Sequence, residues 1–333
     1  MIPLSHVMAG VVVGRLTRKW IQPEGAGPPA WRDPLVAAGI AASCFPDWDV
    51  LPGLVFGYEG AQFHRGATHS AFGVAVQALA MTPIGLALWR WVRARLPQLR
   101  LAEPPAWQPL FATLLAGMGL HALVDSLNPW GVAPWWPLTR EGARWNLVHE
   151  GDLGFLALTA LAAAVSLRAS AKVIALTSVL GVAAFCGWKA ERRNEAQAIA
   201  TRGFGVEATV FPSPGPQCPW VALAARGKTL EAACVAPAGD PAMRVVRAVE
   251  PARSPEVDAS KANPSVADFL EDRNFAFAQL ETDAAGRRVV LWRDLRESLF
   301  DREQDAPSGL AVTFDLDGRI AKVEHRWLLK LAF

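Results

Sequence analysis

The sequence predicts a mainly α, polytopic membrane helical bundle, followed by a small, mostly β or α+β extracytoplasmic domain. Of its 333 residues, 52% are hydrophobic, which is more apolar sequence than one soluble core needs. The long apolar runs all lie before Trp188, and charged residues crowd the segment after Lys189. Basic residues in the first part concentrate in every second loop between the apolar runs. We therefore expect two domains, residues 1–190 and residues 191–333.

Six apolar segments are candidates for membrane helices. A simple span needs about 20 apolar residues, and only some of the six reach that length. We expect the short segments to be tilted, re-entrant or extended by polar residues that face the protein interior. The six segments are residues 2–14, 34–45, 70–91, 109–127, 153–167 and 173–188.

The distribution of basic residues predicts how these segments are oriented, because Lys and Arg concentrate on cytoplasmic loops. Residues 15–32, 90–100 and 168–172 hold most of the basic side chains of the membrane part and alternate along the chain. Placing them in the cytoplasm puts the residues after Trp188 outside it. We expect a multi-pass protein of the bacterial inner membrane with an extracytoplasmic C-terminal domain, whose tryptophans lie at the membrane surfaces.

The C-terminal part changes character after Glu191, where a helical linker leads into short β-like runs. Residues 289–292 predict a strand. Residues 310–314 and 320–325, joined at Asp317-Gly318, predict a hairpin. Residues 237–264, rich in Pro, Ala and Ser, predict a loop.

Two cysteines, Cys218 and Cys234, flank a stretch that can fold as a hairpin. They would pair if the domain faces an oxidising compartment. The net charge of +2 is too small for the electrostatic footprint of a nucleic-acid-binding protein, so we expect no nucleic-acid partner. Membrane lipid is an expected partner, and a protein partner cannot be named from the sequence.

Ionisable residues in the membrane part carry the chemistry, because such groups are costly at membrane depth unless they have partners or a function. Asp47 and Asp49 are two residues apart, so in an extended segment both could point the same way. His64 and His69 precede an apolar helix. His121 and Asp125 are four apart in a helical segment, and so share one face. His6 lies in the first apolar segment, and all these groups fall at the same membrane face.

Structural interpretations of the same residues remain open. Asp47 and Asp49, flanked by prolines, could form an exposed turn. His64 and His69 could be interfacial or capping residues. His121 bonded to Asp125 could tie two helices together. Together, however, imidazole and carboxylate ligands predict a divalent metal site, with zinc or manganese as the expected ion.

Four motifs resemble the YdjM/YbcI-like inner-membrane metal-dependent hydrolase family. They are SHVMAG at residues 5–10, FPDWDVLPG at 45–53, HRGATHS at 64–70 and HALVDSLNPWG at 121–131. The resemblance implies a membrane-bound metal-dependent hydrolase. It puts six residues at matching positions: Asp47, Asp49, His64, His69, His121 and Asp125. Val50 stands where the family commonly has a histidine after Asp-x-Asp.

We therefore predict a hydrolase acting on a phosphoester or lipid-linked substrate such as a lipid phosphate at the extracytoplasmic face. Its predicted catalytic residues are Asp49, Asp125 and Arg65, because a carboxylate that is not a ligand would act as general base and a guanidinium binds phosphate. Arg65 could instead contact lipid headgroups. One alternative is a non-catalytic membrane protein that a metal stabilises and whose outer domain binds a partner. A transporter would show paired internal repeats, which the sequence lacks. The predicted metal residues are Asp47, Asp49, His64, His69, His121, Asp125 and His6.

Overall fold

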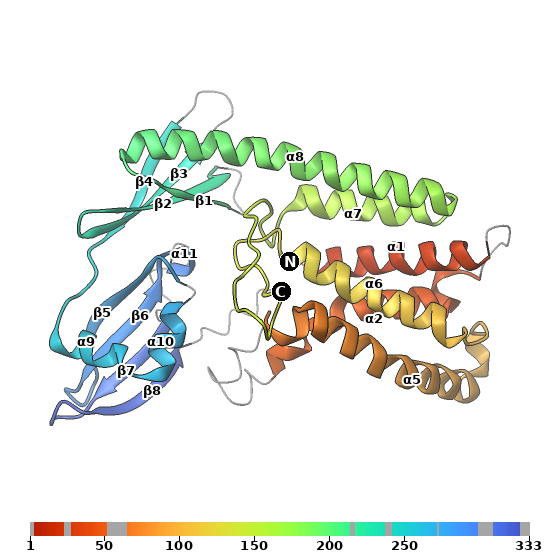
Figure 1. The fold of residues 1–333 in the computed structure, drawn as a ribbon, viewed down its shortest axis with the longest axis horizontal. Helices are drawn as coiled ribbons and strands as arrows, with labels where there is room; N and C mark the ends of the chain where they lie inside the picture. Colours follow the sequence, from red (N-terminus) through yellow and green to blue (C-terminus); the bar gives the residue numbers. More distant parts are fainter. Residues whose placement is uncertain are drawn as a thin grey trace. The chain divides into compact units, whose positions relative to one another are not determined.

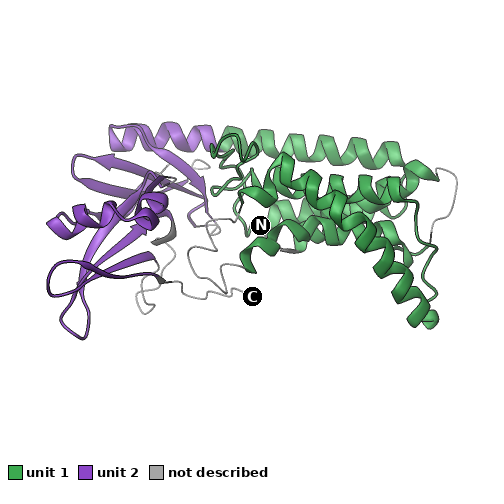
Figure 2. Cartoon of the chain, turned by 60° about the horizontal axis from the view of Figure 1, so that its bottom comes forward, with its two compact units in different colours: residues 1–51, 62–192 green, residues 52–61, 193–333 purple. Residues whose placement is uncertain are grey.

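A computed structural model describes residues 3–22, 28–51, 65–213, 217–236, 242–271, 273–298 and 309–326. The chain divides into two compact units, with the change at Arg192 and Arg193 (Figure 2). We call the described residues up to Arg192 the helical unit, and those from Arg193 onward the sheet unit. The chain thus has a helical N-terminal region followed by two small antiparallel sheets.

The helical unit is built from six helices that pack side by side (Figure 1). Helix α1 contacts α2, α6 and α7, while α6 also contacts α2 and α5. Short 3-10 turns η1 (Ala30–Arg32), η2 (Phe45–Asp49), η3 (Ala67–His69) and η4 (Pro97–Leu99) lie between them. The helices are α1 (Pro3–Ile21), α2 (Pro34–Cys44), α5 (Ala71–Arg95), α6 (Trp107–Asp125), α7 (Leu153–Ser166) and α8 (Ala171–Phe204).

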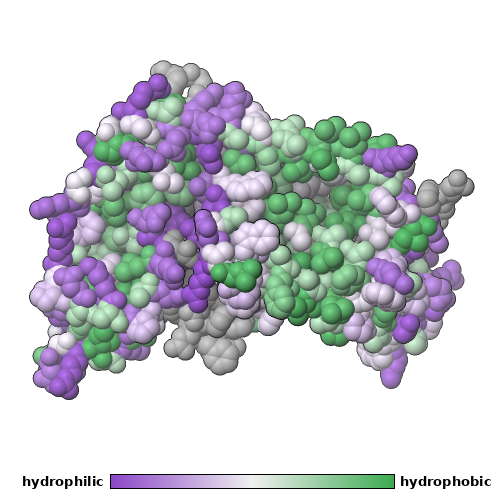
Figure 3. All heavy atoms as spheres, viewed as in Figure 1, coloured by the Kyte–Doolittle hydropathy of each residue, from purple (hydrophilic) through white to green (hydrophobic). Residues whose placement is uncertain are grey.

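Among the described residues, three helices are long and apolar enough to cross a membrane: α5, α6 and α8. The other predicted segments are helical but shorter or more charged. Helix α2 has 11 residues and so rises only about 16 Å, and α7 has 14. Hydrophobic side chains gather on the surface over the helical unit (Figure 3), as expected for helices that face lipid.

Two arginines near the end of α1 bind the neighbouring helices. At one end Arg18 in α1 bonds both carboxylate oxygens of Asp33, at 2.8 and 3.0 Å, and Arg15 donates to the carbonyl of Leu167 at 3.3 Å. These contacts join the end of α1 to the start of α2 and the end of α7. Arg15 and Arg18, two of the basic residues predicted to face the cytoplasm, therefore lie at the end of the unit away from His6.

Polar side chains fix where several helices begin. Asp33 accepts a hydrogen bond from Leu35 N at 3.0 Å at the start of α2, and Ser70 accepts one from Gly73 N at 2.9 Å at the start of α5. Asp152 does the same for Phe155 N at 2.9 Å at the start of α7. Each cap satisfies an amide that the first turn leaves unbonded, so Ser70 sets the position of His69 just before α5.

Glycines allow α1 and α2 to pack backbone against backbone. A Cβ on Gly39 would lie 2.3 Å from the carbonyl oxygen of Gly10, and one on Gly14 would lie 2.5 Å from that of Leu35. Small residues at such a crossing let two helices approach more closely than larger side chains would. The close crossing brings His6, near the start of α1, toward the end of α2.

The sheet unit contains two antiparallel four-stranded sheets, with strand orders β1-β2-β3-β4 and β5-β6-β7-β8. The end of α8 packs on the first sheet through Ala196, Ala200 and Phe204. Helices α9 (Pro255–Lys261) and α10 (Pro264–Glu271) pack on the second, and α11 (Leu295–Ser298) follows β6. The strands are β1 (Thr209–Pro212), β2 (Trp220–Arg226), β3 (Thr229–Ala236), β4 (Ala242–Val249), β5 (Ala276–Thr282), β6 (Arg288–Asp294), β7 (Gly309–Phe314) and β8 (Ile320–Arg326).

Most local predictions for the sheet unit are confirmed, and one is wrong. The predicted hairpin is β7 paired with β8, and Cys218 and Cys234 form a disulfide with a Cα–Cα distance of 5.3 Å. The loop predicted for residues 237–264 is wrong, because it contains β4 and α9. The Ser254 side chain caps α9 and Pro255 opens it, so these residues mark a helix start rather than a loop.

Candidate metal centre

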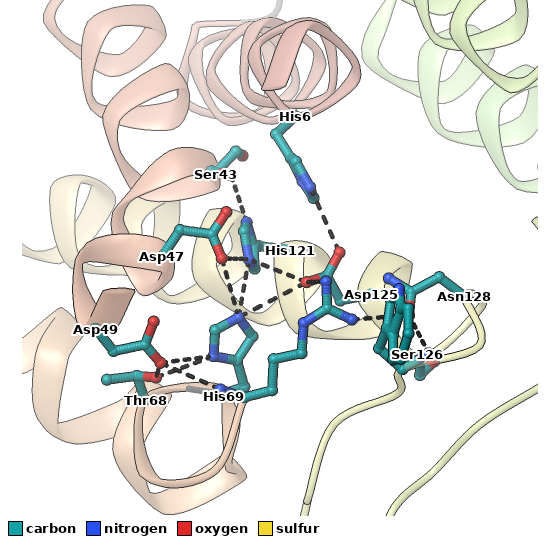
Figure 4. Close-up of polar contacts among 12 residues, drawn as sticks. His6, Ser43, Asp47, Asp49, Thr68, His69, His121, Asp125, Ser126 and Asn128 are labelled. Atoms are coloured by element: carbon teal, nitrogen blue, oxygen red, sulfur yellow. Dashed lines mark hydrogen bonds and ion pairs between the residues drawn. The ribbon is translucent and has the colours of Figure 1, made fainter. Parts of the chain in front are cut away.

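Four side chains meet at one end of the helical unit, each from a different position along the chain (Figure 4). Asp47 comes from η2, directly after α2, and His69 from η3, directly before α5. His121 and Asp125 come from the last turns of α6. One ligand atom from each of the four lies within 4.8 Å of every other, so these residues could hold a metal ion.

The distances within this cluster suit a small divalent cation. His69 Nε2 lies 3.1 Å from His121 Nε2, and Asp47 Oδ1 lies 3.4 Å and 3.3 Å from these two nitrogens. Asp125 Oδ2 lies 3.7 Å from His121 Nε2 and 3.8 Å from His69 Nε2. Ligand bonds of about 2.1 Å in a tetrahedral site place the ligand atoms about 3.4 Å apart. The observed separations cluster around that spacing.

Hydrogen bonds on the far side of each imidazole decide which nitrogen carries the proton. The Nδ1 atom of His121 lies 2.7 Å from the carbonyl oxygen of Ser43, which can only accept a hydrogen bond. His121 therefore carries its proton on Nδ1, and Nε2 presents a lone pair to the cluster. A metal-binding histidine is held in the same way, by a partner on its other nitrogen.

His69 is held by a relay of two hydrogen bonds. The hydroxyl of Thr68 donates to Asp49 Oδ2 and lies 2.9 Å from His69 Nδ1. Because the Thr68 hydrogen is directed to the carboxylate, its oxygen accepts from Nδ1–H. Nε2 of His69 therefore also presents a lone pair toward the cluster.

Asp49 thus lies beside the cluster, on the Nδ1 side of His69. Its Oδ2 atom is 3.5 Å from His69 Nδ1 and accepts a hydrogen bond from the backbone amide of Arg65 at 3.2 Å. The segment is not extended, the condition under which Asp47 and Asp49 would point the same way, because η2 is a 3-10 helix. With three residues per turn, side chains two apart point to different sides. The roles predicted for Asp49 as a ligand and a catalytic residue stay predictions.

His6 and Arg65 approach Asp125 from two directions. His6 Nε2 lies 3.6 Å from Asp125 Oδ1, and its ring stacks on His121 with centroids 4.1 Å apart. Arg65 Nη2 lies 3.7 Å from Asp125 Oδ2 and donates to Glu150 Oε1 at 3.2 Å, while Nη1 donates to Asn128 Oδ1 at 2.8 Å. Asp125 therefore lies between the imidazole of His6 and the guanidinium of Arg65.

The electrostatic environment favours positive charge in the cluster. Burial alone would raise the pKa of Asp47, but the imidazoles of His121 and His69, which donate to this carboxylate when they carry a second proton, outweigh burial and hold that pKa below its ordinary value. Burial would lower the pKa of His69, yet the carboxylates of Asp47 and Asp49 raise it above the ordinary value. Carboxylates that stabilise a proton here would stabilise a metal cation in the same way.

The structure brings together most of the residues that the sequence singled out. Asp47, His69, His121 and Asp125 form the cluster, Asp49, His6 and Arg65 adjoin it, and His64 lies outside the described residues. The sequence analysis missed four contributors: Ser43, Thr68, Asn128 and Glu150. Of these, Thr68 and Asn128 lie inside the quoted motifs, and Thr68 is directly next to a predicted ligand.

Comparison with known protein families shows to which family the chain belongs. The model of the family described as "YdjM inner membrane protein" matches residues 1–194, which is more than half of the chain. The chain belongs to the YdjM inner membrane protein family. The YdjM match ends two residues after Arg192, the last residue of the helical unit, so it covers all four residues of the cluster. Comparisons with curated proteins and with solved structures give no match.

Proposed function

We propose that this YdjM-family protein is a metal-dependent hydrolase that acts on a phosphoester or lipid-linked substrate at the extracytoplasmic membrane face. One observation carries the proposal. Two imidazole Nε2 lone pairs and the Asp47 carboxylate are directed at the same point, with separations of 3.1 to 3.4 Å. Lone pairs so close together repel one another unless a cation lies between them.

The donor set fits a divalent ion such as zinc or manganese, because imidazole nitrogen with carboxylate oxygen is typical of both. Such an ion would supply Lewis-acid activation of a phosphoester oxygen and of water. Asp47, His69 and His121 would hold it. Asp49 and Thr68 position His69, and Ser43 positions His121 through its backbone carbonyl.

Asp125 and Arg65 would have different roles at the site. Asp125 is close enough to His69 and His121 to be a fourth ligand, and its second oxygen faces His6. A carboxylate in that position could instead accept a proton from water as a general base. Arg65 donates to Asn128 and Glu150, so it would bind a substrate phosphate by exchanging one of these partners.

The extracytoplasmic location of the site is supported from both units. Arg15 and Arg18 lie at the end of the helical unit opposite the centre, as the positive-inside rule expects of the cytoplasmic end. The Cys218–Cys234 disulfide of the sheet unit is typical of an oxidising compartment. Together they favour a multi-pass protein of the bacterial inner membrane with the centre and the sheet unit on the outer side.

The function is tested by purifying the protein in detergent, loading it with zinc or manganese, and measuring hydrolysis of lipid phosphates and other phosphoesters. We expect turnover by the wild type, and its loss in His121→Ala. His149→Ala is the matched control, since this histidine lies outside the cluster and accepts from Gly151 N at 3.0 Å. A metal-loaded wild type that hydrolyses no phosphoester would contradict the proposal.

A non-catalytic, metal-stabilised protein whose sheet unit binds a partner is the second candidate. It is favoured by the number of protein donors, because four ligands close a structural zinc site, while a catalytic one keeps a position open. Asp125→Asn separates the two. Metal retained with turnover lost identifies a catalytic carboxylate, whereas metal and folding stability lost together, in a protein without turnover, supports the structural role.

A further inference from the structure

A loop at the same end as the metal centre projects apolar side chains outward. It lies in the connection between α6 and α7, and we call residues 133–138 the tryptophan loop. Reciprocal hydrogen bonds between Val132 and Ala143, at 3.2 and 2.8 Å, close its base. Leu138 N donates to Trp135 O at 2.8 Å and forms its turn. The tip is thus held in a defined conformation.

The composition of this tip is unusual for a surface in water. From Gly131 to Leu138 the sequence GVAPWWPL contains no charged, amide or hydroxyl side chain. Trp135 is 62% exposed and Leu138 is 89% exposed. Burying apolar surface would stabilise the protein by about 25 cal/mol for every Å² removed from water. Exposed apolar patches therefore commonly mark contact sites. Tryptophan is the side chain most typical of membrane interfaces.

The loop is bonded to a helix whose apolar face is exposed. Pro134 O accepts a hydrogen bond at 2.9 Å from Ala71 N, the first residue of α5. Phe72, Val76 and Leu79 follow at i, i+4 and i+7 and are all exposed large hydrophobic residues. Helix α5 is one of the candidate membrane spans, and this spacing puts the three on one face. The tryptophan loop therefore begins where that apolar face begins.

The same loop is bonded directly to the segment that carries His69. Ala133 N donates to Arg65 O at 3.0 Å, and Pro134 O binds Ala71 N, so both ends of residues 65–71 are attached to it. The side chain of Asn128 makes a further connection, because its Oδ1 accepts from Gly131 N and from Arg65 Nη1. The tryptophan loop and His69 are therefore held at a fixed position relative to each other.

We propose that the tryptophan loop lies in the interfacial layer of the lipid bilayer and holds the metal centre at the level of the lipid headgroups. The partner that the loop contacts is lipid, because the loop continues the apolar face of a membrane-length helix. The inference rests on the proposed function only for the substrate, which becomes a phosphoester of a membrane lipid. Contact with lipid does not itself require activity.

Fluorescent labelling tests the contact independently of turnover. Cys44 and Cys186 are first replaced by alanine, the disulfide is kept, and an environment-sensitive label is attached to Leu138→Cys in phosphatidylethanolamine/phosphatidylglycerol vesicles. Leu316→Cys is the matched control, because Leu316 is 88% exposed in a turn between Asp315 and Asp317. We expect the label at position 138 to shift to shorter wavelength and to be quenched by doxyl-labelled lipid, while the label at position 316 is unchanged.

Two results would overturn the proposal: a label at position 138 that behaves like the one at 316, or a wavelength shift without lipid quenching, which would mean that protein covers the loop. A second measurement compares turnover by Leu138→Asp. We expect hydrolysis of a vesicle-embedded phosphoester to fall several-fold, with a water-soluble phosphoester and metal content unaffected. Equal loss on both substrates would contradict a lipid-specific role. If the wild type hydrolyses neither, the proposed function fails while the quenching result still decides lipid contact.

Discussion

The Nε2 atoms of His69 and His121 lie 3.1 Å apart, although a hydrogen-bond acceptor holds the Nδ1 proton of each ring. With both protons on the far side, two lone pairs face each other beside the Asp47 carboxylate. Without a cation, one ring would need a second proton or a different orientation. The arrangement is therefore one that could hold a metal ion.

The relay through Thr68 gives the first prediction. Thr68→Val removes the hydroxyl that links His69 Nδ1 to Asp49 and leaves every ligand in place. We expect metal affinity to fall about 10–100-fold, the range typical of lost partners of ligating histidines. Competition with a fluorescent chelator measures it. Thr82→Val, at a buried threonine that bonds its own helix at Ala78 O, should leave the affinity unchanged. Equal affinities in both variants would refute the relay.

The sequence could predict the centre because its strongest signals are local. His121 and Asp125 share a face of any helix that contains them, and the order of the motifs, together with the family resemblance, indicated Asp47 and His69. It could not separate the roles of Asp47 and Asp49, because that depends on the 3-10 geometry of η2. Glu150 meets Arg65 from 85 positions away, and no pattern within either segment encodes such a contact.

For the fold too, the sequence predicts local elements but not the pairing of distant ones. Long apolar runs and tightly turned hairpins are local patterns, and the structure has α5, α6, α8 and the β7–β8 hairpin where these were expected. The composition of residues 237–264, rich in Pro, Ala and Ser, predicts a loop. Pairing of β4 with β3 along the whole strand overrides that composition, and strand pairing depends on a partner rather than on the residues themselves.

The glycine contact between α1 and α2 gives a second prediction. Gly39→Ala would place a methyl group 2.3 Å from Gly10 O and force the helices apart. We expect a loss of about 1–3 kcal/mol, as for other overpacked contacts, seen as a lower Tm in detergent. Gly119→Ala is the control, since a Cβ there meets nothing within 4 Å. An unchanged Tm for Gly39→Ala would show that the helices do not cross so closely.

Metal removal gives a third prediction. A ligand that binds only the folded state adds RT ln(1 + [L]/Kd) to stability, about 2.7 kcal/mol at a hundred times Kd. Treatment with a chelator should therefore lower the Tm of the wild type, and added zinc or manganese should restore it. The Tm of His121→Ala should not respond to either. A chelator effect of equal size in both proteins would mean that the metal acts elsewhere.

The disulfide of the sheet unit gives a fourth prediction. In denaturant without reductant, only Cys44 and Cys186 should react with maleimide, and after reduction all four cysteines should. Cys218 and Cys234 are 16 residues apart, and a closed loop of that size stabilises by about 3 kcal/mol. Reduction should lower the resistance of the sheet unit to proteolysis. Four reactive thiols in freshly prepared protein from the membrane would contradict the pairing and weaken the extracytoplasmic assignment.

Elemental analysis of the detergent-purified protein, after dialysis against metal-free buffer, tests the central claim most directly. We predict about one divalent ion per chain in the wild type and in His149→Ala, and nearly none in His69→Ala or His121→Ala, with all four proteins folded as judged by circular dichroism. Metal bound equally by the two cluster variants and the wild type, or a wild type that binds none when zinc or manganese is supplied, would contradict a metal centre at these residues.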